Sequence, residues 1–252
     1  MTLVDQLHLE LIHAADFRMY DTKGAMLPGV ANRIGVPMGA VRKAAKRIIR
    51  QGLSLPFLEE ALSSRGRLPH EVVKTMGLVI AEDPALSFQN RLDLARRYLP
   101  FITNWAVCDL FAGAMKSMKA HPEEAFRFIE SLTASENIWE IRTGLVFLLS
   151  HFLDPETLPR AIGLALRPNV LLRARDAYYV SMGLAWALSI FYVADPKLTA
   201  SKFLDAVRVG SLDEATARKT AQKIRESLRV SRAAAREFRE NMESALGLSL
   251  RR

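Results

Sequence analysis

The chain has 252 residues, half of them hydrophobic, which is enough for the core of one large domain or two small ones. Its formal net charge of +8 favours a polyanionic partner such as nucleic acid or an acidic membrane surface. The single cysteine excludes an intramolecular disulfide framework, and no apolar run reaches the roughly 18 to 20 residues of a membrane span.

A period of about 3.6 residues runs through nearly every segment, and strands are hard to find. Short breakers that contain Pro or Gly separate stretches rich in Ala, Leu, Arg, Lys and Glu. The helices that this pattern predicts are, in chain order, roughly 2–18, 38–51, 54–64, 69–82, 86–98, 101–118, 122–132, 136–151, 155–165, 171–192, 196–208, 213–228 and 231–245. We therefore expect an all-α protein.

The breakers in the second half of the chain recur with a rhythm. Asp154-Pro155 and Asp195-Pro196 are each predicted to start a helix, with Asp as the N-cap and Pro at the first helical position. Paired helices that recur every 35 to 40 residues or so indicate a HEAT-like helical-repeat solenoid, formed as one domain over residues 1–252. Sequence identity between the repeats is poor, so an irregular helical bundle is the alternative.

Charge is spread unevenly along the chain. Residues 161–252 carry 16 Lys and Arg against 9 Asp and Glu, whereas residues 101–160 carry 5 against 8. The last two predicted helices and their connection hold Lys223, Arg225, Arg229, Arg232 and Arg236. Because equivalent helices of a solenoid line one concave surface, we expect that surface to be basic.

An aromatic residue and a carboxylate stand one turn apart in the predicted helix 101–118. Trp105 and Asp109 are at positions i and i+4, so they project from one face. The packing stripe predicted beside them consists of Ile102, Ala106, Leu110 and Gly113 or Ala114, while Phe101, Ala112 and Lys116 stand in the same row as the pair. A carboxylate beside an aromatic wall can stabilise a developing positive charge. The other interpretation is a surface acid beside a half-buried Trp.

Two further groups place aromatic or basic side chains a turn apart. One group is Trp139 and Arg142 on the predicted helix 136–151. In the other, Tyr178-Tyr179 opens a helix in which Met182 and Trp186 continue the row. Arg suits phosphate because its planar fork donates two hydrogen bonds. The alternatives are that the aromatic residues belong to the core, and that Arg142 pairs with Glu136 or an acid on a neighbouring helix.

With these motifs the sequence resembles the AlkD-like DNA alkylation repair proteins, which are bacterial HEAT-repeat DNA glycosylases. The motifs that match, in the family's order, are Ile34-Gly35-Val36-Pro37, Val41-Arg42-Lys43-Ala44-Ala45-Lys46, His70-Glu71, Asn104-Trp105 to Asp109, Trp139 to Arg142-Thr143, Tyr178-Tyr179 with Ala185-Trp186, and Gln222-Lys223-Ile224-Arg225. No single motif is decisive, but their order is specific and covers most of the chain.

The resemblance implies a glycosylase that excises N3- and N7-alkylated purines from duplex DNA and holds the lesion from its backbone side, without flipping the base into a pocket. It implies that Asp109 is the catalytic carboxylate, that Trp105 and Trp186 are aromatic walls, and that Arg142 clamps a phosphate. The other residues expected to bind DNA are Arg42, Lys46, Trp139, Tyr178, Tyr179, Lys223, Arg225 and Arg229.

We expect no metal and no cofactor, because the five histidines are scattered and an alkylpurine cation already leaves readily. The expected partner is duplex DNA containing alkylated purines, bound by a cytoplasmic, nucleoid-associated monomer that does not contact a membrane. The N-terminus lacks the basic region and apolar stretch of a secretory signal. One alternative is a non-catalytic binder of damaged or branched DNA. Another is a helical-repeat scaffold for a protein partner.

Overall fold

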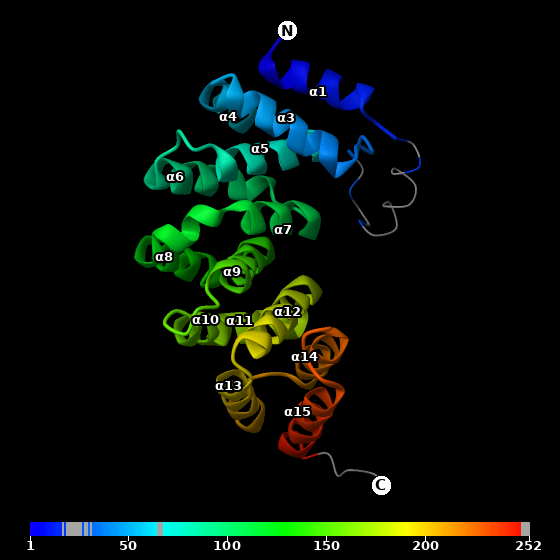
Figure 1. The fold of residues 1–252 in the computed structure, drawn as a ribbon, viewed down its shortest axis with the longest axis vertical. Coiled ribbons are helices and arrows are strands. Elements are labelled where there is room, and N and C mark those ends of the chain that lie inside the picture. The colour runs from blue at the N-terminus through cyan, green and yellow to red at the C-terminus, as the bar shows by residue number, and fades with distance from the viewer. Residues whose placement is uncertain (17, 19–26, 28–29, 31, 65–67, 248–252) are drawn as a thin grey trace. The chain divides into compact units, whose positions relative to one another are not determined.

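A computed structural model describes residues 1–16, 18, 27, 30, 32–64 and 68–247 (Figure 1). Over these residues the chain forms helices and connections and no β-strand, so the predicted all-α class is confirmed. The chain folds into two compact units, unit 1 (Met1–His121) and unit 2 (Pro122–Arg252). That the two units form one domain stays a prediction.

Unit 1 is built around α5. Its helices are α1 (Leu3–His13), α3 (Met38–Arg50), α4 (Ser54–Ser63), α5 (His70–Glu82), α6 (Phe88–Tyr98) and α7 (Trp105–Ala114), with the 3₁₀ helices η1 (Leu99–Phe101) and η2 (Lys116–Ala120). The nearly fully buried α5 packs against α3 and α7, and also against α4 and α6 (Figure 1). Residues on α3 and α7 are therefore positioned by the same central helix.

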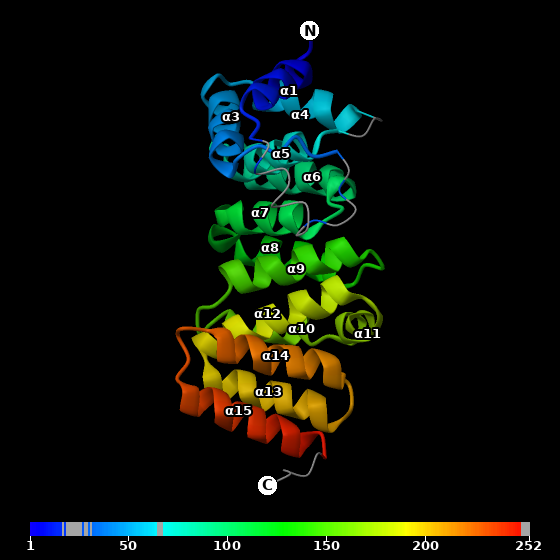
Figure 2. The ribbon, with the colours of Figure 1, turned by 90° about the vertical axis from the view of Figure 1, so that its right-hand side faces the viewer.

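Unit 2 is built in the same way around α12. Its helices are α8 (Pro122–Thr133), α9 (Ile138–His151), α10 (Leu158–Ala165), α11 (Pro168–Asp176), α12 (Tyr178–Ala194), α13 (Pro196–Arg208), α14 (Glu214–Glu226) and α15 (Arg232–Ala245). The helix α12 packs between α9 and α14, while α10 contacts α8 and α13. Helix α15 lies against both α13 and α14 at the end of the unit (Figure 2). This is a stack of helix pairs in two layers.

Side-chain hydrogen bonds reveal the repeat length directly. Many bonds between neighbouring helix pairs join residues 34 to 40 positions apart. Examples are Arg47–Glu10, Arg97–Glu59, Arg160–Glu123, Arg167–Glu130, Asn169–Thr133, Arg175–Gly210 and Ser181–Thr216. A helical-repeat architecture with the predicted spacing is therefore confirmed. The concave basic surface stays a prediction.

One glycine permits the close approach of two helices in unit 1. A Cβ atom at Gly77 would lie 2.7 Å from the Tyr98 hydroxyl oxygen, which is closer than atoms of this kind approach. That hydroxyl donates to Val73 O over 2.9 Å, and burial raises the pKa of Tyr98. Gly77 thus allows a buried tyrosine of α6 to reach the backbone of α5.

Two of the helices predicted in the first half are wrong in extent. The predicted helix 2–18, of which residue 17 lies outside the described residues, ends at His13 because Asp16 N–H turns away to bond Gly35 O over 3.0 Å. The predicted helix 101–118 is an α-helix only over α7. Asn104 is extended, with φ −156° and ψ 162°, and separates α7 from η1, while η2 follows after Met115.

Two boundaries in the second half are also wrong. The predicted helix 171–192 is two helices, α11 and α12, separated at Ala177 with φ −113° and ψ 103°. Asp195 caps α13 through Leu198 N–H over 2.9 Å, as predicted, but Asp154 does not cap a helix at Pro155. Its carbonyl closes a turn with Leu158 N–H over 2.8 Å, and α10 begins only there.

Candidate functional site

The N-terminus of α7 fixes the direction of its side chains. The Asn104 side-chain oxygen accepts a hydrogen bond from Val107 N–H over 3.1 Å, which satisfies one of the amide groups that a helix start leaves unpaired. The buried face of α7 consists of Val107, Cys108, Phe111 and Ala112. The predicted packing stripe is therefore wrong, because Ile102 precedes the helix, and Ala106, Leu110, Gly113 and Ala114 line an open groove instead.

This groove has a volume of about 630 Å³, and we name it the Trp105–Asp109 groove. Its lining comes from α3, α5, α7 and η2, together with Leu27 outside these elements. The lining residues are Leu27, Met38, Arg42, Lys74, Glu82, Trp105, Ala106, Asp109, Leu110, Gly113, Ala114 and Lys116. Trp105 and Asp109 are both half-buried. The indole and the carboxylate thus share one cavity wall, with apolar residues between the charged ones.

Charged side chains of both signs surround Asp109. Arg42, Lys74 and Lys116 supply three cations, and Glu82 supplies a second carboxylate that pairs with Arg42 over 3.2 Å. Sequence patterns indicate Arg42 and place Lys116 in the same row as Trp105 and Asp109. They miss Lys74 and Glu82, because these two residues join the groove only through the packing of separate helices. The position of Lys74 one turn after the His70-Glu71 motif was an available signal.

Glu71 fixes the backbone segment that leads into α3. Its buried carboxylate accepts backbone hydrogen bonds from Ile34 over 2.9 Å, from Gly35 over 3.0 Å and from Val36 over 3.4 Å. Gly35 has a φ of +86°, a conformation that other residues rarely adopt. Two of the motifs noted in the sequence therefore bind each other, and together they set where α3 presents Arg42.

His70 supports the N-terminus of α7 in a similar way. The Asn104 side-chain amide donates to His70 Nδ1 over 3.5 Å, and the same Asn104 caps α7. Burial, followed by the positive charge of Lys74, lowers the pKa of His70 from 6.5 to about 4, despite the opposing charge of Glu71. A neutral His70 therefore supports the helix that carries Trp105 and Asp109.

In unit 2 an aromatic cluster covers a buried arginine. The ring centroids of Trp139 and Tyr179 are 4.8 Å apart, and those of Tyr178 and Tyr179 are 5.3 Å apart. The Arg142 guanidinium donates to Tyr179 O over 2.9 Å, and the side chain is only 6% exposed. Glu136, one of the alternative partners considered for Arg142, pairs with Arg173 at 3.8 Å.

The aromatic row on α12 is open to solvent to different degrees. Tyr178 is exposed, and Met182 and Trp186 are half-buried on the face that follows it. Because these residues are spaced by four, they form a stripe along one side of the helix. Trp186 is therefore partly accessible to solvent, and its role as a wall stays a prediction.

The remaining basic residues from the sequence are at the surface. Arg42 and Lys46 line a shallow groove on α3 together with Gly39, Lys43, Ile49, Arg50 and Glu82. Lys223 is half-buried and Arg225 exposed on α14, and Arg229 is exposed in the connection to α15. Charged side chains at these places can contact phosphates without a change in the fold.

Within unit 1 the structure brings together Arg42, Trp105 and Asp109, and within unit 2 it brings together Trp139, Arg142 and the two tyrosines. A site that joins Asp109 with Arg142 and Trp186 stays a prediction. Over the described ranges no cluster of three or more His, Cys, Asp or Glu can hold a metal ion. In the same part of the chain, every helix is too short or too polar to cross a membrane.

The comparisons agree with these motifs. A family model described as "DNA alkylation repair enzyme" matches residues 25–230. No curated protein and no solved structure matches this chain. The matched range contains the Trp105–Asp109 groove and every predicted site residue of unit 2.

Proposed function

This chain belongs to the family of DNA alkylation repair enzymes, and from that premise we propose that it is a DNA glycosylase acting on N3- and N7-alkylated purines in duplex DNA. The observation that supports this most strongly is the Trp105–Asp109 groove. It combines a half-buried carboxylate, an aromatic wall and three basic side chains in one cavity.

Cleavage of the glycosidic bond to an alkylated purine requires little help from the protein at the base. Alkylation gives the purine ring a positive charge, so when the bond from C1′ to the purine nitrogen breaks, its electron pair neutralises the departing base. No proton has to be delivered to the leaving group. The positive charge that remains develops on the sugar, and water then adds to C1′ and releases a proton.

Asp109 is suited to that developing charge. A fixed carboxylate in a partly desolvated groove stabilises a cationic sugar without reorganisation of solvent, and one such preorganised contact contributes about 3 kcal/mol. Arg42, Lys74 and Lys116 line the same groove, where they balance the carboxylate and can contact the phosphates of the strand. Trp105 offers a flat apolar surface for the sugar of the lesion nucleotide.

In this proposal unit 2 contributes binding contacts. Arg142, which the bond to Tyr179 O holds in place, clamps a phosphate of the lesion strand, because its planar guanidinium suits phosphate. Trp186, which is half-buried, forms a second wall on the lesion strand. The lesion is held from its backbone side, so the base is not flipped into a pocket.

The direct test is release of free base from methylated duplex DNA, followed by chromatography with mass detection. We expect 3-methyladenine and 7-methylguanine in the soluble fraction and no base released from undamaged duplex. Tight binding of methylated duplex without release of either base would contradict the proposal and favour a non-catalytic DNA binder. Absence of DNA binding at low salt would favour the protein scaffold.

A further inference from the structure

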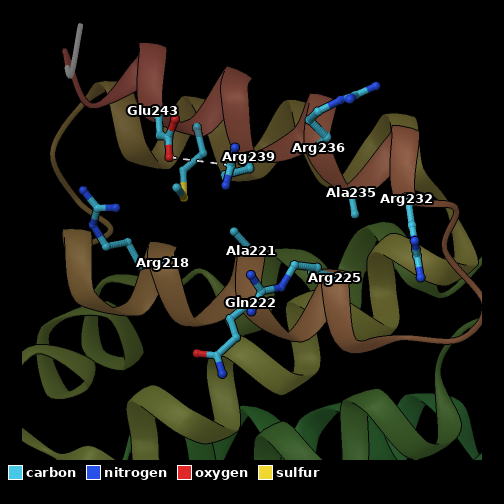
Figure 3. Close-up of a pocket in the computed structure, with 10 residues that line it drawn as sticks. Arg218, Ala221, Gln222, Arg225, Arg232, Ala235, Arg236, Arg239 and Glu243 are labelled. Carbon is cyan, nitrogen blue, oxygen red and sulfur yellow. Dashed lines mark ion pairs between the residues drawn. The ribbon is translucent and has the colours of Figure 1, made fainter. Parts of the chain in front are cut away.

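The last two helices of unit 2 enclose a second groove, of about 530 Å³, which we name the arginine groove. Its lining consists of Arg218, Ala221, Gln222 and Arg225 from α14, and Arg232, Ala235, Arg236, Arg239, Met242 and Glu243 from α15. Figure 3 shows arginines from both helices around the gap between them. The buried, small Ala221 and Ala235 form the floor, so the groove stays open.

Positive charge in this groove exceeds what the protein itself balances. Five arginines face one carboxylate, that of Glu243. Arg218 pairs with Glu214 over 2.7 Å, and Arg239 approaches Glu243 at 3.7 Å. Over the described residues, Arg225, Arg232 and Arg236 have no acidic partner. Like charges held together raise the free energy of the fold unless an external anion balances them.

The charge along α15 opposes its helix dipole. Arg232 occupies the first helical position, no acid lies in the first turn, and no base lies in the last turn. Cations near a helix N-terminus are unfavourable, because the helix dipole already places positive charge there. The neighbouring α14 has the usual order, with Glu214 in the first turn and Lys223 and Arg225 in the last. The charges on α15 therefore serve something other than helix stability.

The arrangement fits an extended anion better than a compact one. Arg218 and Arg225 are seven residues apart on one face of α14, as are Arg232 and Arg239 on α15. Seven residues correspond to about 10 Å along a helix, while nucleotides of one strand are spaced by about 3.4 Å along the duplex axis. The two arginine rows thus match the phosphates of several successive nucleotides.

We propose that the arginine groove is a second nucleic-acid site, which binds the phosphodiester backbone of duplex DNA independently of the lesion. It rests on the proposed function only in taking DNA as the partner. Its contacts are to phosphate alone, so it binds without sequence preference and anchors the protein to undamaged DNA. A free polyphosphate shares this chemistry and is the alternative source of the anion.

The test compares two double variants that each remove two positive charges. Arg232→Gln with Arg239→Gln alters the arginine groove, and Lys202→Gln with Arg208→Gln alters exposed residues of α13 outside it. Affinity for undamaged duplex is measured by fluorescence anisotropy at several salt concentrations. We expect the groove variant to lose about tenfold or more in affinity, and the salt slope to fall by about two, because each phosphate neutralised contributes about 0.9.

We expect the α13 variant to lose less than about threefold, and the groove variant to keep or raise the parent's melting temperature, because removing Arg232 relieves the helix dipole. Equal losses in both variants would overturn the inference in favour of net charge. The groove variant could instead bind DNA like the parent and lose only the thermal protection that inorganic tripolyphosphate gives. That result would assign the groove to a free anion and would also overturn the inference. Release of alkylpurine by the parent is scored separately. A parent that binds through the groove and excises nothing refutes the glycosylase proposal alone.

Discussion

The Trp105–Asp109 groove of unit 1 and the arginine groove of unit 2 are similar in volume and opposite in chemical character. The first mixes three cations with two carboxylates and an indole, and its walls come from four separate elements. The second has five arginines against one carboxylate on two consecutive helices. A carboxylate weakens the binding of a phosphate chain, which agrees with the proposal that Asp109 has a task other than binding.

The two grooves also differ in what lies beneath them. Under the first, a buried polar layer of His70, Glu71 and Asn104 fixes the entrances of α3 and α7. Under the second are apolar residues, among them Ala221 and Met242. Stabilisation of a transition state requires charges fixed in position, whereas attraction of a polyanion does not. The fixed polar layer under the Trp105–Asp109 groove therefore suits the catalytic role proposed for that groove. The apolar residues under the arginine groove suit the binding role proposed there.

Asp109→Asn makes the first groove resemble the second, and it is the change with the largest expected effect. Shape is preserved while the charge is lost, so single-turnover excision should fall by roughly 100-fold or more, about 3 kcal/mol in the barrier. Affinity for duplex DNA with an uncleavable lesion analogue should stay the same or rise, because a negative charge near the phosphates is gone.

The matched control for that change is Asp93→Asn, an exposed carboxylate of α6 that pairs with Arg96 away from the groove. It should excise at the parent's rate. Equal excision by the Asp109 variant and the parent would remove Asp109 from the mechanism.

Low pH should destabilise unit 1 through the buried His70, which supports α7. His70 has a pKa of about 4 in the folded protein against 6.5 for the ordinary side chain, so the unfolded chain binds a proton first. The free energy of unfolding should therefore fall as the pH drops from 6.5 to 4, by up to about 1.4 kcal/mol per pH unit. His70→Gln keeps a hydrogen-bond acceptor for Asn104 and removes this titration.

The measurement is chemical denaturation of the parent and of His70→Gln at pH 7 and at pH 4.5. The parent should be the more stable protein at pH 7, and the difference should shrink by on the order of 2 kcal/mol at pH 4.5. A difference that does not depend on pH would contradict the role given to His70.

A smaller effect is expected for Trp186→Ala in unit 2. This change tests whether Trp186 acts as an aromatic wall or as a core residue. Because Trp186 is half-buried, its truncation should lower excision by about tenfold while costing less stability than a core truncation, which costs about 3 to 5 kcal/mol. Phe191→Ala, on the same helix and fully buried, is the control for that full cost. A melting temperature as low as that of Phe191→Ala, with normal excision per folded molecule, would show that Trp186 acts as a core residue.

The periodicity of the sequence predicted the all-α class, the repeat length and most helices, because amphipathic spacing is a local property. Periodicity alone missed the break at Ala177, since alanine favours helix and the chain there has neither Gly nor Pro to mark it, but the aromatic row correctly indicated that a helix opens at Tyr178. Periodicity also placed the packing stripe of α7 on the wrong face. Ala106, Leu110 and Ala114 have helical spacing and are apolar, and only the packing of α5 decides which side of α7 is covered.

Candidate residues were found where they belonged to contiguous motifs, such as Trp105 and Asp109. Lys74 and Glu82 were missed because they enter the groove from another helix, α5. The supporting roles of His70 and Glu71 were also beyond the sequence, since their partners Asn104 and Gly35 lie more than thirty residues away. Long-range contacts of this kind follow from tertiary packing and carry no local signal.

The central claim is that cleavage depends on the positive charge of the lesion and on electrostatic stabilisation at the sugar, without proton delivery to the base. It is tested most directly by two duplexes that differ in one atom, one with 7-methylguanine and one with its neutral 7-deaza isostere. Single-turnover assays with the parent protein should release 7-methylguanine and leave the isostere intact. Release of the neutral base at a comparable rate would contradict the account.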